Sequence, residues 1–534
     1  MQLKMGFNYN STLLLAFLIL LGVFFVLELN TSLKTQITFG DEGFHARMAQ
    51  WISENKEYPI WTPFEYTPLS KSSYARPPLF NILEASFLFV FGNHEIILKA
   101  FPPLLALLVG ISVFLLAKRL FNIEIGIISS LVLVTLPSFV TYSVLTFDEM
   151  LLTFFMSLFA LTFAIGVKEK NRRYLVLSAL FAGLTFLTKH AGIIILLFVP
   201  ILFLYSLLSE RKFLPNFKNY LLFGVVFLLV TTPFLLRNFY YYGTPECQQL
   251  PLFDEDGCVL KQFEENYKFE VRTLAGGSEN ELLSFGLQNF INFAYGNIWF
   301  ILIGFFGGLI ALIKHHSGET RAVLLIMLFL GLVALYQTSS RTEDTVRQLL
   351  PWTPFIAIVS AIYWNEIYKF LRKYQTYLGL AVIGLVLFFG YQSITSKLQS
   401  MENVKTFSPL FFEACDWVKE NLDEDVRLMT FWGHRAAYSC QRTIAAGFAD
   451  IRLNPNPESI RDFSEMHGIT HFFIQKFSLS QQPSRESYSV SFVQLLENNP
   501  EIFKPVYENG PPLDQCLQQG GCDGNIIYEV IYDN

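Results

Sequence analysis

Two acidic pairs are the residues of this sequence best suited to carry out chemistry. Asp41 and Glu42 follow a long apolar run, and His45 lies about one helical turn further on. Asp148 and Glu149 separate two other apolar runs with hardly any loop between them. A carboxylate in such a place can take a proton from a hydroxyl or an amide. The structural alternative is a polar helix start, because acidic residues favour the first turn of a helix.

Basic residues at the ends of other apolar runs would complete an anion site. They are Arg76, Lys189 and Arg347. Arginine binds phosphate oxygens in bidentate geometry, and cationic groups stabilise a departing phosphate. The alternative for any one of them is a side chain that only reaches the lipid headgroups. Taken together, the acidic and basic residues predict group transfer from a lipid phosphate, such as a lipid-phosphate sugar.

The composition indicates which elements must position these residues. Of the 534 residues, 52% are hydrophobic and 16% are charged, whereas soluble proteins have about 25% charged residues. The apolar residues form blocks of roughly 17–25, the length that crosses a bilayer as a helix. We therefore expect a polytopic α-helical membrane protein with about eleven spans. They are 11–29, 96–117, 125–144, 150–167, 174–188, 191–208, 220–236, 290–313, 321–337, 350–368 and 376–394.

The charged residues indicate the orientation and exclude one class of partner. Lysine and arginine gather in alternate loops, which the positive-inside rule assigns to the cytoplasm. The N-terminus is then cytoplasmic, and the C-terminus is extracytoplasmic. The net charge of −6 argues against a nucleic-acid partner. The C-terminus carries no retention signal, which favours the plasma membrane of a prokaryote.

The cysteines agree with this orientation. All six fall in segments expected outside the cytoplasm, where disulfides are stable. Sequence proximity favours Cys247–Cys258, Cys415–Cys440 and Cys516–Cys522, although six cysteines allow fifteen pairings.

Two domains are expected. Residues 1–398 would form the transmembrane part, with a first outer loop at 30–95 and a second at 238–289. Residues 399–534 have shorter apolar blocks and predict a small extracytoplasmic α/β domain. The run at 79–92 is too short to span and would lie at the interface.

The motifs around these residues resemble the C-type membrane glycosyltransferases that use polyprenyl-phosphate sugars. Asp41-Glu42 is similar to the acidic pair in the first outer loop of protein O-mannosyltransferases and aminoarabinose transferases. Arg76-Pro77-Pro78-Leu79 is similar to their His-Pro-Pro-Leu element, with arginine in place of histidine. Segments 187–192 and 347–351 resemble their Leu-Thr-Lys-Gly and Arg-Tyr-x-x-Pro elements.

A second resemblance is to the catalytic subunits of oligosaccharyltransferases. Asp41-x-x-Phe44-His45-x-Arg47 and Phe147-Asp148-Glu149 are similar to their two acidic motifs. Segment 430–435 resembles their Trp-Trp-Asp-Tyr-Gly signature but lacks its acidic residue. That departure favours transfer of a single sugar over transfer of an oligosaccharide.

The first resemblance implies an inverting transfer of a mannose-like hexose from a polyprenyl- or dolichyl-phosphate donor to a protein, lipid or glycan acceptor. Asp41 would be the base, and Glu42 would orient the acceptor or a positively charged partner. Arg76, Lys189 and Arg347 would bind the donor phosphate. Asp148, Glu149 and His45 would bind the sugar or the acceptor. The second resemblance implies a divalent cation, Mg²⁺ or Mn²⁺, with Asp41, His45 and Asp148 as candidate ligands.

A lipid or solute transporter is the main rival outside enzymes. It would explain the many spans and the charges near the membrane. It also predicts paired internal repeats, which the sequence does not show.

Overall fold

The computed structural model describes most of the chain. The described residues are 9–37, 40–67, 70–73, 76–198, 200–201, 217–242, 299–315, 318–338, 347, 349–374, 376–402, 407–430, 433–445, 456–480, 488–519 and 521–532. The predicted disulfide Cys247–Cys258, most of the second outer loop and residues 290–298 of one expected span lie outside them.

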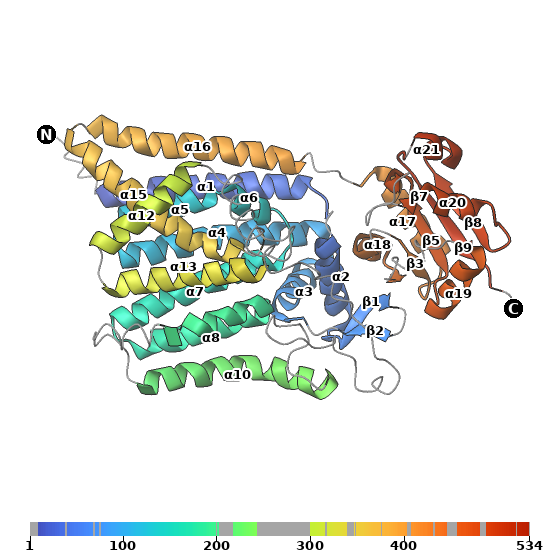
Figure 1. Ribbon diagram of the computed structural model, residues 1–534, viewed down its shortest axis with the longest axis horizontal. Helices are drawn as coiled ribbons and strands as arrows, with labels where there is room; N and C mark the ends of the chain where they lie inside the picture. The colour runs from blue at the N-terminus through green and yellow to red at the C-terminus, as the bar shows by residue number, and fades with distance from the viewer. Residues whose placement is uncertain are drawn as a thin grey trace.

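Helices from the first three quarters of the chain lie side by side, and a mixed α/β region stands at one end of them (Figure 1). The helices of this part are α1 (Tyr9–Lys34), α2 (Gly40–Asn55), α3 (Leu79–Phe91), α4 (Glu95–Leu120), α5 (Ile123–Val134), α6 (Pro137–Ser143), α7 (Asp148–Lys168), α8 (Arg172–Thr188), η1 (His190–Leu197), α10 (Phe217–Tyr242), α12 (Trp299–His315), α13 (Gly318–Thr338), η3 (Leu350–Trp352), α15 (Thr353–Tyr374) and α16 (Thr376–Glu402). Each predicted span falls on one or more of these elements.

Four helices of the described residues are long and apolar enough to cross a membrane. They are α1 from Ser11, α4, α7 and α10 from Leu221. Within the described residues, stretches of α12 and α13 (Ile303–Lys314 and Arg321–Val333) are apolar but shorter, and the expected count of eleven remains a prediction. The short run at 79–92 forms α3, a helix of 13 residues.

The expected span 125–144 is divided into two helices. α5 and α6 are bent by 68° at a short break, and together they have the apolarity of one span. Pro137 begins α6, and the residue before it, Leu136, is extended. Proline lacks the amide that would continue α5 and disfavours helical geometry in the preceding residue. The expected span 191–208 likewise begins as the 3-10 helix η1.

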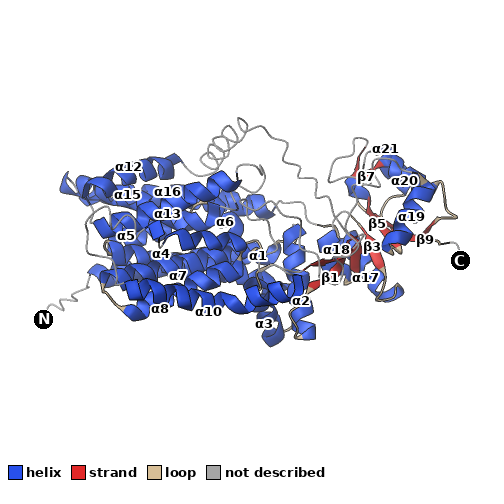
Figure 2. Cartoon of the chain, turned by 60° about the horizontal axis from the view of Figure 1, so that its bottom comes forward, coloured by secondary structure: helices blue, strands red, loops and turns tan. Residues whose placement is uncertain are grey.

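Apart from two strands of the first outer loop, the remaining elements lie in the C-terminal region, residues 407–532, and the strands gather at one end of the molecule (Figure 2). The elements of the C-terminal region are α17 (Pro409–Asn421), β3 (Arg427–Met429), α18 (Gly433–Cys440), β4 (Thr443–Ala445), α19 (Pro457–His467), β5 (His471–Gln475), η4 (Lys476–Ser478), β6 (Leu479–Ser480), β7 (Tyr488–Ser489), α20 (Val490–Glu497), β8 (Phe503–Asn509), α21 (Leu513–Gln519) and β9 (Asn525–Val530).

The main sheet joins this region to the first outer loop. Its order is β2-β1-β4-β3-β5-β9-β8, where β1 (Trp61–Thr67) and β2 (Ser70–Ser73) come from that loop. β1 pairs in parallel with β4, with Glu65 opposite Ile444. The loop and the C-terminal region, which the sequence suggests are separate, therefore share one hydrogen-bonded sheet.

Helices cover both faces of the sheet around β5, an interior strand that is buried throughout. Phe472 and Ile474 of β5 pack with α19, α20 and α21, whereas Phe473 between them packs with α17 and α18. Alternate residues of a strand point to opposite faces. The unbroken apolar run of β5 is therefore the pattern expected of a strand covered on both sides.

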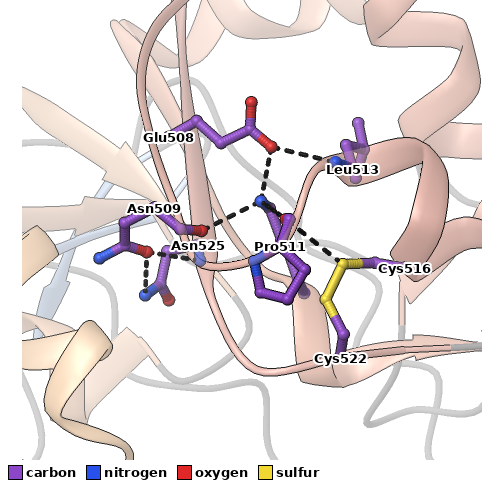
Figure 3. The surroundings of a disulfide bond; sticks show 8 residues. Glu508, Asn509, Pro511, Leu513, Cys516, Cys522 and Asn525 are labelled. Atoms are coloured by element: carbon purple, nitrogen blue, oxygen red, sulfur yellow. Dashed lines mark hydrogen bonds and ion pairs between the residues drawn. A yellow bond between two sulfur atoms is a disulfide. The ribbon is translucent and has the colours of Figure 1, made fainter.

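Two disulfides hold the C-terminal region together. Cys415–Cys440 joins α17 to the end of α18, and Cys516–Cys522 closes the turn after α21. These are the pairings that sequence proximity favours. Beside the second bond lie Glu508, Asn509 and Pro511 (Figure 3). Their oxygens accept hydrogen bonds from the buried Nζ of Lys476 at 2.5, 3.0 and 2.6 Å, so this charge is fully satisfied.

Candidate active site at the membrane boundary

Five charged residues from distant parts of the chain meet where the helices adjoin the C-terminal region. Asp41 lies in the first turn of α2, Asp148 and Glu149 in the first turn of α7, and Lys189 caps the end of α8. Arg347 lies just before η3. The carboxylates thus lie at helix N-termini and the lysine at a C-terminus, the positions that helix dipoles favour.

Arg347 is the centre of this cluster. Its Nη1 donates to Oδ2 of Asp41 at 2.5 Å, and its Nε donates to Glu149. Its Nη2 lies 3.8 Å from Oδ1 of Asp148. The guanidinium also lies over the ring of Phe147, 4.4 Å from the centroid. One arginine therefore connects the two acidic pairs that the sequence analysis selects.

Lys189 is the second cation of the cluster. Its Nζ donates to Oδ1 of Asp148 at 3.1 Å and also to Glu149. The Asp148-Glu149 pair is thus held from two sides, by Lys189 and by Arg347. Asp41 has only Arg347 as a direct partner among the salt bridges of the described residues.

The charges in the cluster keep Asp41 ionised. Burial favours its protonated form, but the charge and hydrogen bond of Arg347, with smaller contributions from His45 and Arg76, outweigh burial and hold the pKa of Asp41 well below its usual range. The same carboxylates raise the pKa of Arg347 despite its burial. Asp41 is therefore an anion whose basicity Arg347 suppresses.

Arg76 and His45 lie beside the cluster without bonding directly to its carboxylates. The Arg76 guanidinium lies 4.2 Å from the centroid of the Phe44 ring, and its charge acts on Asp41 and His45. His45 is 4% exposed, and its Nδ1 lies 2.8 Å from Oδ1 of Asn81. Burial, with the Arg76 charge, lowers the pKa of His45 to about 4, so the ring is neutral at pH 7.

Glu42 points away from Asp41 into the protein. It is fully buried, and its Oε1 lies 3.3 Å from Nζ of Lys99 and accepts the backbone amide of Thr146 at 2.8 Å. Glu42 therefore pairs with a buried lysine. Lys99 was missed by the sequence analysis, although a lone lysine in the expected span 96–117 is a recognisable signal.

Glu84 is a second acidic residue that the sequence analysis missed. It is completely buried on α3, and neither carboxylate oxygen has a hydrogen-bond partner within the described part of the chain. Burial, reinforced by the nearby charges of Asp148 and Glu42, raises its pKa well above the usual range. Glu84 is therefore a neutral acid behind the site. A lone glutamate in an apolar run was its only signal.

The C-terminal region contacts the first turn of α2 through α18. A Cβ on Gly43 would lie 2.8 Å from backbone atoms of His434 and Arg435, so only glycine fits this approach. Arg435 is buried and lies 3.7 Å from Oε2 of Glu95, while Oε1 of Glu95 accepts the amide of Ile37. Glu95 thus links α18 to the connection between α1 and α2. Phe431 and Trp432 lie outside the described residues.

The residues expected to hold a metal do not fit one as arranged. No group of three histidine, cysteine or acidic side chains in the described residues could hold a metal ion. Asp41 and Asp148 both face Arg347, and Lys189 neutralises Asp148 further. His45 directs its Nδ1 to Asn81 instead of to the carboxylates. A guanidinium occupies the position between the acidic pairs where a cation would bind.

Residues 75–236 match the family model described as dolichyl-phosphate-mannose-protein mannosyltransferase. This stretch includes Arg76, Asp148, Glu149 and Lys189, whereas Asp41 and Arg347 lie outside it. No curated protein matches the chain significantly.

Solved structures match nearly the whole chain. ArnT from Cupriavidus metallidurans, solved with undecaprenyl phosphate, is 13% identical with a TM-score of 0.63, over 97% of this chain and 98% of its own. The oligosaccharyltransferase AglB from Archaeoglobus fulgidus, solved with an inhibitory peptide and a dolichol-phosphate, is 15% identical with a TM-score of 0.62, over 86% and 69%. The arabinofuranosyltransferase AftD from Mycobacteria is 15% identical with a TM-score of 0.57, over 96% and 40%.

The chain is therefore an integral membrane protein with the fold of the C-type membrane glycosyltransferases. The family match and the structural matches together confirm its resemblance to that superfamily. At these identities the structural matches establish the fold alone.

Proposed function

We propose that this protein is an inverting glycosyltransferase that moves one mannose-like hexose from a polyprenyl-phosphate donor to an acceptor. The observation that carries the proposal is the cluster in which Asp41, with 37% of its side chain exposed, lies against Arg347. A reachable carboxylate thus lies beside an arginine, a residue type well suited to binding phosphate. The dolichol-phosphate and undecaprenyl phosphate bound to AglB and ArnT support a lipid phosphate as the donor group.

The reaction assigns a role to each residue of the cluster. Asp41 takes the proton of the acceptor hydroxyl, whose oxygen attacks the anomeric carbon while the bond from that carbon to the phosphate oxygen breaks. Arg347, Lys189 and Arg76 stabilise the charge that the leaving phosphate gains. Asp148 and Glu149 hold Lys189 and Arg347 in place and bind the sugar or the acceptor. Glu42, paired with Lys99, fixes α2 so that Asp41 faces the site.

The remaining details of the proposal follow from the sequence. The transfer takes place on the extracytoplasmic side of a prokaryotic plasma membrane, where the positive-inside rule places the C-terminal region. The acceptor is a protein, lipid or glycan. An oligosaccharyltransferase-like reaction is the second candidate, favoured by the likeness to AglB.

The experiment is an assay of purified protein in nanodiscs for release of polyprenyl monophosphate. Polyprenyl-phosphate mannose and polyprenyl-phosphate glucose serve as donors, and wild type is compared with Asp41→Asn. The matched control is Asp416→Asn, because Asp416 is an exposed aspartate that pairs with Lys419 in the C-terminal region. We expect Asp41→Asn to lower the rate about 10²–10⁴-fold, the usual contribution of a general base.

Other outcomes would assign the protein elsewhere. Turnover of a pyrophosphate-linked oligosaccharide, without release from any monophosphate donor, would establish the oligosaccharyltransferase-like reaction. Inertness toward both kinds of donor would contradict the proposal and favour a transporter.

A further inference from the structure

Arg347 bonds the carboxylate of Asp41, and in the proposed reaction it also binds the donor phosphate. We infer that Asp41 and the donor phosphate bind Arg347 in turn: Asp41 holds the guanidinium while the donor is absent, and the phosphate displaces it. Binding of the lipid phosphate would thus free the carboxylate of Asp41 to act as the base. This inference rests on the proposed function and adds an order of events to it.

The contacts of Arg347 indicate which carboxylate would leave. Glu149 is 1% exposed and Asp148 is 13% exposed, and both are also held by Lys189. Asp41 is 37% exposed and has no second cation bonded to it in the described residues. An incoming anion can therefore reach the Asp41 contact and break it without disturbing the rest of the cluster.

Competition follows from the geometry of the guanidinium. Its Nε and one Nη are directed at Glu149 and Asp41, and the Phe147 ring covers one face. Binding a phosphate through two parallel hydrogen bonds requires two neighbouring N–H groups. Since Glu149 is buried, the contact that must break is the one between Nη1 and Asp41. The phosphate then takes the place of the Asp41 carboxylate.

The charges that move during transfer suit this exchange. A polyprenyl-phosphate sugar is a phosphodiester with a charge of about −1, and the released monoester carries about −1.5 to −2. Asp41 loses its negative charge when it takes the acceptor proton, and the phosphate gains one when its bond to the sugar breaks. Once Asp41 has left it, Arg347 can stabilise the negative charge that develops on the phosphate.

The test measures binding of a radiolabelled polyprenyl monophosphate to the full chain in phosphatidylcholine nanodiscs. Asp41→Asn removes the competing anion, so we expect it to bind the lipid about tenfold more tightly than wild type while remaining inactive. There are two controls. Asp416→Asn should bind the monophosphate as tightly as wild type does. The uncharged polyprenol should bind wild type and Asp41→Asn equally. Equal or weaker binding by Asp41→Asn would overturn the inference.

A second measurement uses unaltered protein, so it does not depend on how the variant folds. Asp41 in wild type is labelled with a water-soluble carbodiimide and a nucleophile, and its peptide is quantified by mass spectrometry. Polyprenyl monophosphate should raise labelling of Asp41 several-fold, whereas polyprenol should not. Unchanged labelling at saturating lipid would also overturn the inference. If wild type and variants all fail to bind the monophosphate, the proposed function itself fails.

Discussion

Oδ2 of Asp41 and Nη1 of Arg347 lie 2.5 Å apart, although 306 positions separate the two residues in the sequence. The contact connects the first outer loop to the segment that precedes η3 and α15. Because Arg347 also bonds Glu149, it joins three parts of the chain. A planar guanidinium has several donors in fixed directions, whereas a lysine ammonium is a point charge.

Arg347 leads to a prediction about metals. We expect transfer activity to survive exhaustive chelation and to gain nothing from added Mg²⁺ or Mn²⁺, because the guanidinium already bridges the acidic pairs. The measurement is the release assay with and without chelator. Loss of activity on chelation, restored by Mg²⁺ or Mn²⁺, would show instead that Arg347 moves away to admit a cation.

The buried pair of Glu42 and Lys99 should be important for stability. Their side chains are 0% and 2% exposed, so Glu42→Gln leaves a buried ammonium without its carboxylate. Breaking such a pair costs about 3–5 kcal/mol, which thermal unfolding of the purified protein would detect. The matched control is Glu402→Gln, whose exposed pair with Lys34 should contribute less than about 1 kcal/mol. The double variant Glu42→Gln with Lys99→Met should be more stable than Glu42→Gln alone, and additive losses would refute the coupling.

His45 should make the stability of the protein depend on pH. Its pKa is about 4 in the folded state, against 6.5 ordinarily. Between these values the unfolded chain binds the proton more tightly, so stability falls as the pH falls from about 6.5 to about 4. The total loss from this residue is about 3 kcal/mol. In His45→Gln the melting temperature should depend less steeply on pH across that range than in wild type. An unchanged slope would assign the pH dependence to other groups.

Gly43 should be required for the contact between α2 and α18. A Cβ there would lie 2.8 Å from the backbone of His434 and Arg435, so Gly43→Ala must displace α18 from the first turn of α2. We expect a loss of about 1–3 kcal/mol and a several-fold lower transfer rate. Gly22→Ala is the matched control, because a Cβ there meets nothing within 4 Å. If both variants behave alike in limited proteolysis and activity, the contact does not matter.

The sequence predicted the helices better than the site. Long apolar blocks made most helices visible, and the break at Pro137 could have been anticipated from the residue itself. The charged residues could be selected because ionisable groups are rare beside apolar runs. Their meeting could not be derived, since Asp41, Lys189 and Arg347 are brought together only by helix packing.

The ion-pair partner of each charged residue also could not be predicted from the sequence. Glu42 and Asp41 are adjacent, yet one side chain points to Lys99 and the other to Arg347. Helical geometry rotates neighbouring side chains by roughly 100°, so adjacent residues face different surroundings. The two residues are adjacent in the sequence, which suggested a shared role, but in the structure they have different partners.

The pairing of β1 with β4 has a consequence for how the C-terminal region can be studied. If residues 399–534 were produced alone, β4 would lose its neighbour and become an open edge with unpaired backbone groups. Exposed strand edges recruit other strands and promote aggregation. The excised fragment should therefore self-associate, whereas a chimera carrying residues 61–73 beside β4 should stay monomeric.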